Sequence, residues 1–211
     1  LHQLLETLRR FQRLGIAQAV TTDYEDPDVR LSDMDGDRRA DVVVTTESGL
    51  AIGYNLDGSD WTEPEIVGEV DPSERPRFSD GRTELCDVNG DRVQDLCRLR
   101  SGSLLYWLGR GRGRFEPAES ARGVPDFDPS SRWQLADLNG DGWIDLLHVG
   151  VGEVAYRLAY GVGDFGPTQT VAGTPQRLST TTVKLADMNG SGSTDIVWAD
   201  PTATPDRSWQ D

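Results

Sequence analysis

The hydrophobic residues of the chain gather in short runs that return at a regular spacing. Four of these runs are five residues long and rich in aliphatic residues, at 42–46, 96–100, 146–150 and 196–200. After the first three, a glycine turn leads into a second apolar and aromatic run, at residues 50–55, 104–109 and 154–160. Runs of this length on either side of a glycine turn predict β-hairpins rather than helices.

A polar loop of nine residues stands directly before each of the four runs. The loops read DMDGDRRAD, DVNGDRVQD, DLNGDGWID and DMNGSGSTD, and they begin at Asp33, Asp87, Asp137 and Asp187. The spacings between these aspartates are 54, 50 and 50 residues. Such a period suits the four-stranded blade of a β-propeller, whereas helical-pair repeats are shorter, at about 34 residues.

Two further strands are expected in each unit. An aromatic residue lies 28 positions after the first aspartate of the first three loops and is followed by a proline, so a third strand is expected to start at Trp61, Phe115 and Phe165. The fourth is the segment that enters the next loop, at residues 84–85, 134–135 and 184–185, which match residues 30–31. The sequence therefore predicts an all-β fold of propeller blades, each about 50 residues long with four antiparallel strands.

The repeats are expected to span residues 28–200, with a different segment at each end. Residues 1–20 carry leucines at helical spacing and predict a short amphipathic helix, which packs on the propeller or a neighbouring domain or binds a separate partner. Residues 201–211 are a tail or a truncated continuation. Three complete units and a partial fourth fit a small closed ring or an excerpt of a larger one. The missing initiator methionine and the end at Asp211 favour the excerpt.

Oxygen-bearing side chains occupy positions 1, 3, 5 and 9 of the nine-residue loops. Ca²⁺ binds six to eight oxygen ligands at about 2.3–2.6 Å, and alternate positions of a tight loop can direct their oxygens at one ion. Up to four Ca²⁺ ions are predicted. With the backbone carbonyl of position 7 included, the expected ligands are Asp33, Asp35, Asp37, Arg39, Asp41, Asp87, Asn89, Asp91, Val93, Asp95, Asp137, Asn139, Asp141, Trp143, Asp145, Asp187, Asn189, Ser191, Ser193 and Asp195.

Other metal-binding loops fit less well. An EF-hand needs a glutamate at position 12 and a following helix, but here position 12 is Val44, Arg98, His148 or Trp198, and strand-forming residues follow. Dockerin-type loops also lead into helices. Mg²⁺ is disfavoured because it keeps several waters and takes few protein ligands.

The four loops are expected to differ in affinity, because ligand charge sets the strength of Ca²⁺ binding. The first loop has four aspartates, whereas the fourth has only Asp187 and Asp195 and is predicted to be the weakest. Position 6 is glycine in the last two loops but Arg38 and Arg92 in the first two. If this position requires a positive φ, arginine costs roughly 1 kcal/mol or more there.

The formal net charge of −15 is explained largely by these loops, which hold 12 carboxylates. Four bound Ca²⁺ ions would bring the net charge to −7. The acidity argues against nucleic acid or an anionic membrane as the partner. One basic cluster, formed by Arg110, Arg112 and Arg114, is expected to be a solvated hairpin tip or, alternatively, a docking patch.

The two cysteines, Cys86 and Cys97, flank the second loop at small apolar positions and are either buried free thiols or a cross-strand disulfide.

No run of 18 apolar residues predicts a membrane span, and arginines interrupt any signal-peptide core near the N-terminus. Only two histidines exist, His2 and His148, and no nucleophile-with-base pattern or phosphate-binding glycine loop occurs. The chain is therefore predicted not to be an enzyme.

The loop consensus, the strand after it and the later aromatic residue with glycine or proline resemble FG-GAP/VCBS repeats. The clearest examples of the last feature are Phe165-Gly166-Pro167 and residues 113–117, which read GRFEP. These repeats form the propeller blades of integrin α-subunits and of many bacterial secreted proteins, and the resemblance covers about residues 28–200. It implies a metal at the blade edge between the first two strands, and a secreted or extracellular protein.

A narrower resemblance concerns VRLSDMDGDRRADVVV, WQLADLNGDGWIDLL and TTVKLADMNGSGSTDIVWAD. These segments look like the propeller of B subunits of bacterial insecticidal toxin complexes (Tc toxins), where the propeller docks a shell of Rhs/YD repeats onto a pore-forming subunit. The chain has no YD repeat or effector domain, so toxin activity is not carried over. The expected function is a non-catalytic, Ca²⁺-stabilised scaffold for protein–protein docking within a larger secreted toxin-like protein. The alternative is an adhesion or glycan-binding module that uses the connectors at 68–81, 121–131 and 172–180.

Overall fold

The computed structural model describes residues 26–47, 49–67, 76–127, 132–150, 153–173 and 183–198. These residues form antiparallel β-sheets, and within them the one helical element is the short 3-10 turn η1 (Phe78–Asp80). The predicted all-β class is therefore confirmed. The helix expected in residues 1–20 and the tail at 201–211 lie outside the described residues.

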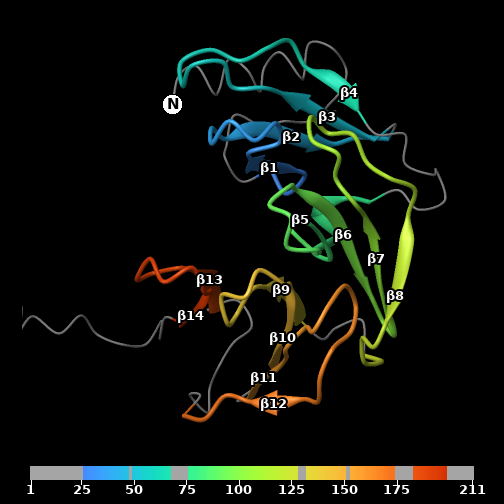
Figure 1. The fold of residues 1–211 in the computed structure, drawn as a ribbon, viewed down its shortest axis with the longest axis vertical. Coiled ribbons are helices and arrows are strands. Elements are labelled where there is room, and N and C mark those ends of the chain that lie inside the picture. The colour runs from blue at the N-terminus through green and yellow to red at the C-terminus, as the bar shows by residue number, and fades with distance from the viewer. Residues whose placement is uncertain are drawn as a thin grey trace, which may run out of the picture.

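Three sheets have four strands each, in the order of the chain, and a two-stranded sheet follows (Figure 1). The first contains β1 (Val29–Ser32), β2 (Asp41–Thr45), β3 (Leu50–Gly53) and β4 (Glu65–Val67). The second contains β5 (Thr83–Cys86), β6 (Asp95–Arg100), β7 (Ser103–Trp107) and β8 (Glu119–Arg122). The third contains β9 (Arg132–Ala136), β10 (Asp145–Gly150), β11 (Glu153–Arg157) and β12 (Gln169–Thr170), and the last contains β13 (Val183–Ala186) and β14 (Asp195–Trp198).

Each sheet is one propeller blade, and the nine-residue loop joins its first two strands. β1 pairs with β2 so that Ser32 faces Asp41, and the same register recurs where Cys86 faces Asp95 and Ala136 faces Asp145. The segment entering a loop was expected to close the preceding unit as its fourth strand. It is instead the first strand of the next blade, because a short tight loop favours pairing with the strand that directly follows it.

The outermost strand of each four-stranded blade begins later than expected. Trp61, Phe115 and Phe165 make only isolated bridges, to Asn55, Gly109 and Ala159, and the outer strand starts four residues further on in all three blades. A proline lies between each aromatic residue and that strand. Because proline has no N–H to donate to a ladder, continuous pairing starts only after it.

The hydrophobic core lies between neighbouring blades rather than inside any one of them. Val43 and Ile52 of the first blade pack with Leu96 and Trp107 of the second in one buried cluster. On the other face of the second blade, Cys97 and Leu99 pack with Leu146 of the third. The third blade packs in turn on Val183 of the fourth. Adjacent residues of one strand thus serve opposite faces, so each blade depends on its neighbours for burial.

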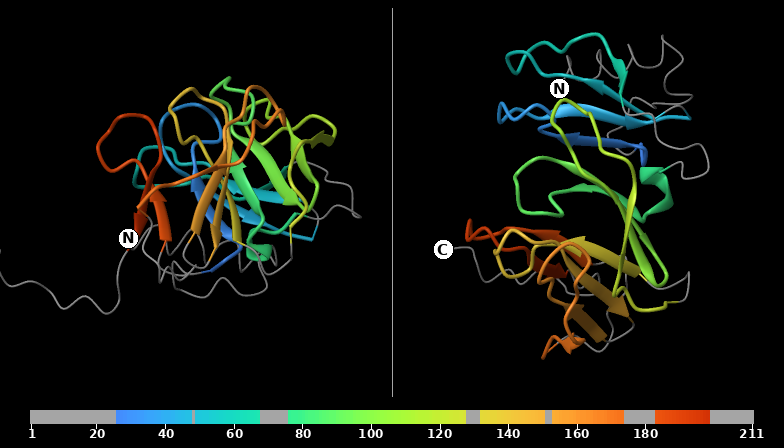
Figure 2. Two further views of the ribbon diagram at one scale, coloured as in Figure 1. Left: turned by 90° about the horizontal axis from the view of Figure 1, so that it is seen from below. Right: turned by 45° about the vertical axis from the view of Figure 1, so that its right-hand side comes forward.

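The first strands of the blades lie on the inner side of the array, and the outer strands β4, β8 and β12 lie away from it (Figures 1 and 2). The nine-residue loops emerge at one end of these inner strands. Within the described residues, no helix is long and apolar enough to span a membrane.

Candidate metal centres

The first aspartate of each loop accepts hydrogen bonds from the backbone of its own loop. Oδ1 of Asp33 accepts from the amides of Gly36 at 2.7 Å and Asp37 at 3.1 Å, and Oδ2 accepts from the amide of Arg38 at 2.7 Å. Asp87 is bound in the same way. These side-chain-to-backbone hydrogen bonds hold the loop closed.

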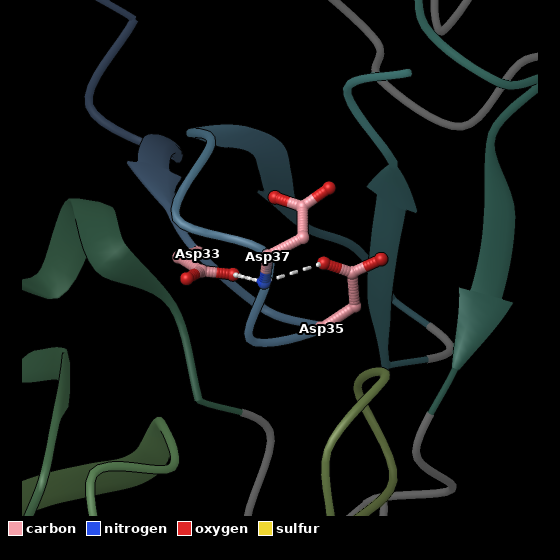
Figure 3. A group of neighbouring side chains, drawn as sticks. All are labelled: Asp33, Asp35 and Asp37. Carbon is pink, nitrogen blue, oxygen red and sulfur yellow. Dashed lines mark hydrogen bonds between the residues drawn. The ribbon is translucent and has the colours of Figure 1, made fainter. Parts of the chain in front are cut away.

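The next alternate side chains converge on the same space in the first loop. Carboxylate oxygens of Asp33, Asp35 and Asp37 lie within 4.8 Å of one another, and all three residues are half-buried. Figure 3 shows Asp33 and Asp35 on either side of the Asp37 backbone nitrogen, which donates to Oδ1 of both. Three like charges this close repel one another unless a cation lies between them. Their oxygens are the ligands that Ca²⁺ prefers, so these residues fit the predicted ion.

The fourth predicted side chain, Asp41, does not belong to that group of carboxylates. It is fully buried at the start of β2, where Oδ2 accepts from the amide of Met34 and Oδ1 from the amide of Asn55, both at 2.8 Å. Asp95 bonds the amides of Val88 and Gly109 in the equivalent way, at 2.8 and 2.6 Å. Position 9 therefore ties the loop to the far end of the following hairpin, a role that the sequence analysis missed.

The pKa values of three position 9 aspartates and of the first aspartate of the fourth loop are shifted in opposite directions. Burial raises the pKa of Asp95 to about 6, although the amides of Gly109 and Val88 oppose it, and burial also raises the pKa of Asp41 and Asp145. By contrast, the Gly192 amide leads a set of hydrogen bonds that lower the pKa of Asp187. A divalent cation beside the buried position 9 carboxylate would favour its charged form.

Loops two and three share one arrangement in which an asparagine replaces the central aspartate. Nδ2 of Asn89 donates to Oδ2 of Asp91 at 3.0 Å, and Nδ2 of Asn139 donates to Oδ2 of Asp141 at 2.8 Å. The amide group replaces one of the repelling charges with a donor. To bind Ca²⁺, each asparagine must present its Oδ1 to the ion instead.

The fourth loop keeps the backbone pattern with weaker ligands. Asp187 accepts from the amides of Gly190 at 2.7 Å and Gly192 at 2.9 Å, as its counterparts do in the other loops. Ser191 occupies position 5, where the other loops have an aspartate. Its hydroxyl lies 2.8 Å from that of Ser193. All four loops thus share one closed conformation.

The model of the FG-GAP-like repeat matches residues 87–148 and 137–198, which together make up more than half of the chain. The chain belongs to the FG-GAP-like repeat family. The first loop lies outside the matched residues, yet its hydrogen bonds repeat those of the matched FG-GAP-like loops.

Solved structures with the same fold include parts of bacterial toxins and a fungal lectin. The Photorhabdus luminescens Tc holotoxin pore shares 23% identity at a TM-score of 0.64, over 85% of this chain and 9% of that chain. The TcdB2-TccC3 crystal structure shares 24% identity at a TM-score of 0.54, over 87% and 9%. An Agrocybe aegerita lectin, described as recognising non-reducing terminal N-acetylglucosamine, shares 22% identity at a TM-score of 0.57, over 80% and 45%.

These likenesses show the fold, and the chain spans only a small part of the toxin chains and less than half of the lectin chain. No curated protein matches the chain.

Position 6 of the FG-GAP-like loops has a positive φ in all four copies. The angles are 69° at Arg38, 68° at Arg92, 89° at Gly142 and 87° at Gly192. Position 6 therefore has the positive φ at which arginine was expected to cost stability. An L-residue in this region costs about 1–2 kcal/mol, so the first two loops carry a strain that the last two avoid.

The backbone amides of the position 7 residues bond within the loops, a contact separate from the carbonyl ligand predicted for them. Their amides donate to the side chain at position 5, at 2.8 Å from Arg39 to Asp37 and 2.8 Å from Val93 to Asp91. The Arg39 guanidinium also pairs with Asp37 at 2.5 Å and donates to the Asn55 carbonyl at 3.1 Å. A positive charge therefore already offsets part of the acidity of the first FG-GAP-like loop.

The basic hairpin tip of the second blade packs against the first blade. The amide of Arg112 donates to the Met34 carbonyl at 2.7 Å, across the blade boundary. Gly113 has a φ of 62°, and a Cβ there would overlap Ile52 and Val67. The segment of alternating arginine and glycine was expected to be a solvated tip or a docking patch. Part of it makes a contact between the first two blades.

Both cysteines are free and buried in the structure. Cys97 is fully buried, and burial, helped by a hydrogen bond with Cys86, raises the pKa of its thiol. In the ladder, Cys97 faces Glu84 and Cys86 faces Asp95, so the two are diagonal neighbours on β5 and β6. Of the two alternatives, the structure contains the pair of buried thiols.

Proposed function

We propose that the chain is a non-catalytic β-propeller scaffold that Ca²⁺ stabilises and that docks other proteins. The observation that carries the proposal is the convergence of Asp33, Asp35 and Asp37 in the loop between the first two strands of a blade. The same closed loop recurs at the same place in the other three blades. Ca²⁺ is therefore proposed to act on the architecture rather than on a substrate.

The stabilising effect has a direct electrostatic reason. The folded loops bring carboxylates close together, which opposes folding, and a bound divalent cation turns this repulsion into attraction. An ion that binds only the folded state adds about 2.7 kcal/mol per site at 100 times its Kd. Because position 9 ties each of the first three loops to the hairpin that follows it, the effect is expected to reach the blade and not only the loop.

Thermal unfolding of the chain in Ca²⁺, in excess chelator and in Mg²⁺ tests this proposal. Ca²⁺ is expected to raise the midpoint clearly above that in chelator, with Mg²⁺ giving a smaller rise. Calorimetric titration should find up to four sites, of which the fourth is weakest because it offers only Asp187 and Asp195 as carboxylates. An identical midpoint in Ca²⁺ and in chelator would refute the calcium role.

A matched pair of variants separates ligand loss from loss of fold. Asp35→Asn changes a carboxylate that lies in the first loop's metal group, whereas Asp57→Asn changes an exposed aspartate in the hairpin turn of the same blade. In Ca²⁺ only Asp35→Asn is expected to lower the unfolding midpoint. In chelator neither variant is expected to lower it. An equal effect of both variants would count against the first loop as a metal site.

The docking role is proposed for a larger secreted protein of toxin-complex type. Its support is the shared fold with the Tc holotoxin pore and TcdB2-TccC3 structures, in which the matching part is a small share of a much longer chain. Cross-linking of the intact parent protein, followed by mass spectrometry, should find links from the blades to other domains or subunits. A parent protein in which the blades give no links outside themselves would contradict the docking role.

Glycan binding is a second candidate, favoured by the shared fold with the Agrocybe aegerita lectin. A glycan array probed with the chain in Ca²⁺ tests it, and specific binding that simple sugars compete away would replace the docking proposal.

Catalysis is not proposed. The one described histidine, His148, packs against Trp133 with ring centroids 4.8 Å apart, and burial lowers its pKa.

A further inference from the structure

A cavity of about 390 Å³ lies between the third and fourth blades. The third blade contributes residues of its loop and of the β11 hairpin, and the fourth blade contributes the start of β14. Four lining residues also belong to the apolar cluster around Val183 that joins these two blades, namely Leu138, Tyr156, Val171 and Ile196. The cavity therefore continues an interface within the protein.

The corresponding surface of the first blade is covered by the hairpin tip of the second blade. The amide of Arg112 in that tip donates to the Met34 carbonyl at 2.7 Å. Gly113 of the same tip lies so close to the first blade that a Cβ on it would overlap Ile52 and Val67. A glycine is thus required where the tip meets the blade before it.

The third blade has the same surface, and it forms the wall of the cavity. Counted from the first aspartate of each loop, the positions of Met34, Ile52 and Val67 are those of Leu138, Tyr156 and Val171. All three residues of the third blade line the cavity. The cavity is therefore the place that a hairpin tip would occupy if it packed on the third blade as the second blade's tip packs on the first.

The second blade confirms the rule for the glycine. The tip of the third blade packs on it, and a Cβ on Gly163 would overlap Ala121, which stands at the position of Val67. Gly163 has a φ of 70°, close to the 62° of Gly113. Both contacts between a tip and the preceding blade therefore use a glycine in the left-handed region, which an L-residue adopts only at a cost.

Beside the cavity, β14 has an open edge among the residues that the structure describes. Its sheet there consists of β13 and β14, whereas in each of the other blades the second strand also pairs with a third. An open strand edge presents N–H and C=O groups to which a further strand can add. The place of the tip and the place of the strand that would carry it are thus adjacent.

Asp195 marks the same position chemically. In the first three blades, Oδ1 of the position 9 aspartate accepts from an amide just past the third strand, at 2.8, 2.6 and 2.7 Å. Asp195 keeps its bond to the loop, because Oδ2 accepts from the Met188 amide at 3.0 Å, but no described residue donates to its Oδ1. Asp195 lines the cavity, so a strand added to β14 would bring an amide to this oxygen.

We propose that this cavity and the open edge of β14 together bind a β-strand followed by a glycine turn, supplied by a partner polypeptide outside residues 1–211. The strand adds to β14, and an amide just past it donates to Asp195. The turn places its glycine against Tyr156 and Val171. The proposal rests on the proposed docking role and names the kind of segment that is docked.

The 211 residues of the chain do not offer such a segment. Residues 199–211 contain no glycine, and they include Pro201 and Pro205, which have no N–H to donate to a ladder. The tip glycines at 113 and 163 each follow the first aspartate of their loop by 26 positions, and the same spacing from Asp187 passes Asp211. A second copy of the chain could offer these two glycines only by removing them from contacts with its own blades.

Fluorescence anisotropy with a labelled peptide of residues 153–167 tests the proposal on the full chain. This segment contains β11 and its glycine turn, with two acidic residues and one basic residue. Because the chain is strongly acidic, general charge attraction does not favour the peptide. The peptide is expected to bind, and a scrambled peptide of the same composition is not. No binding, or equal binding of the scrambled peptide, would overturn the proposal.

Glycine variants of the peptide test the contact at the turn. A Cβ on Gly163 meets the preceding blade, whereas a Cβ on Gly161 has no atom within 4 Å, and both residues have a positive φ. The backbone cost of alanine is therefore shared, and the overlap is specific to Gly163. Gly163→Ala is expected to weaken binding about tenfold more than Gly161→Ala does. Equal weakening would show that the turn does not lie against the third blade.

Variants of the chain locate the binding. Val171→Arg places a charged side chain in the cavity, and the matched control Thr170→Arg changes an exposed neighbour on β12 that does not line it. Val171→Arg is expected to weaken peptide binding by about tenfold or more, with Thr170→Arg within about twofold of the unaltered chain. Equal effects of the two variants would reject the cavity as the site.

Hydrogen exchange of the unaltered chain gives a second measurement that does not depend on a variant's stability. Added peptide is expected to slow the exchange of amides along β14, because strand addition gives them partners. Unchanged exchange along β14 would overturn the proposal. Faster exchange within residues 199–211 on adding peptide would show that the chain's own residues had occupied the site, and it would reject an outside partner.

Sedimentation of the chain alone tests the second copy as the occupant. The chain is expected to stay monomeric at concentrations at which it binds the peptide. A dimer that the peptide dissociates would make a second copy the occupant and would overturn the assignment to another polypeptide.

The outcome is separable from that of the proposed function. Failure of the peptide to bind, together with intact Ca²⁺ stabilisation and intact cross-links from the blades of the parent protein to other domains, would reject the strand site alone. Absence of those cross-links with retained peptide binding would reject docking in the parent protein while leaving the strand site in place.

Discussion

Asp95 provides the sharpest test of how the loops are built into the fold. Its carboxylate is fully buried and joins the Val88 amide in the loop to the Gly109 amide beyond β7, at 2.8 and 2.6 Å. If these bonds hold the blade together, Asp95→Asn destabilises the protein even when no Ca²⁺ is present. A residue that served only as a metal ligand would have no such effect in chelator.

The expected size of the effect follows from the two bonds. Asparagine keeps one oxygen, so one amide loses its acceptor and faces an NH₂ group, and leaving a buried donor unsatisfied costs about 1–3 kcal/mol. Part of this cost is returned, because burial raises the pKa of Asp95 to about 6 and the neutral asparagine avoids burying a charge. We expect a net loss of about 1–2 kcal/mol in chelator, equivalent to roughly 2–8 °C in Tm for a chain of this size.

Asp91→Asn in the same loop is the matched control. Asp91 is exposed, and asparagine can still accept from the Val93 amide that now bonds its Oδ1 at 2.8 Å. Scanning calorimetry at pH 7.5 should therefore find Asp91→Asn neutral in chelator and destabilising in Ca²⁺, and Asp95→Asn destabilising in both. If Asp95→Asn leaves the chelator midpoint unchanged, the reasoning about position 9 is wrong.

Three further predictions concern other parts of the second and third blades. Arg92→Gly relieves a backbone φ of 68°. Once the larger unfolded-state entropy of glycine is taken into account, the free energy of unfolding from denaturant titration is expected to rise by up to about 1 kcal/mol. A lower free energy of unfolding would contradict the strain at Arg92. Ellman's reagent should find no reactive thiol in the folded chain and both Cys86 and Cys97 after unfolding, whereas no reaction in either state would indicate a disulfide. His148 resists protonation in the folded state because burial lowers its pKa below the ordinary 6.5, so the unfolded chain binds the extra proton and stability falls as pH drops below about 6.5. The difference in Tm between the unaltered chain and His148→Phe should shift in favour of the variant between pH 7.5 and 5.5, and a constant difference would show that His148 is not involved.

Much of the fold could be predicted because the sequence repeats it. The runs after the loops at 42–46 and 96–100 became β2 and β6, each beginning one residue earlier at the position 9 aspartate. The positive φ at Arg38 and Arg92 could be foreseen because glycine occupies the same position in the later loops. Comparison between copies thus reveals a local backbone requirement that one copy alone would hide.

Other features depend on contacts that the local pattern does not encode. The bond between Asp41 and the Asn55 amide joins residues 14 positions apart, and it exists only because the β2–β3 hairpin has a particular register. The pairing of Arg39 with Asp37 depends on the rotamer of a long side chain. The cavity lined by β5, β9 and β13 needs residues from several blades, and no motif in the sequence indicates that residues as far apart as Arg82 and Lys184 line one cavity.

The position 9 bonds also explain why the fourth loop keeps its form with only two carboxylates. Asp195 still accepts from the Met188 amide at 3.0 Å, and Asp187 still bonds the amides of Gly190 and Gly192. These two aspartates are the ones that hold the loop closed, whereas the two replaced by Asn189 and Ser191 are those whose counterparts in the first loop converge with Asp33. Weakened metal ligands with retained backbone anchors are the pattern expected if the loop is first an element of the blade and only then a calcium site. Under the proposed calcium role, a repeat that loses much of its affinity for Ca²⁺ would still form a blade.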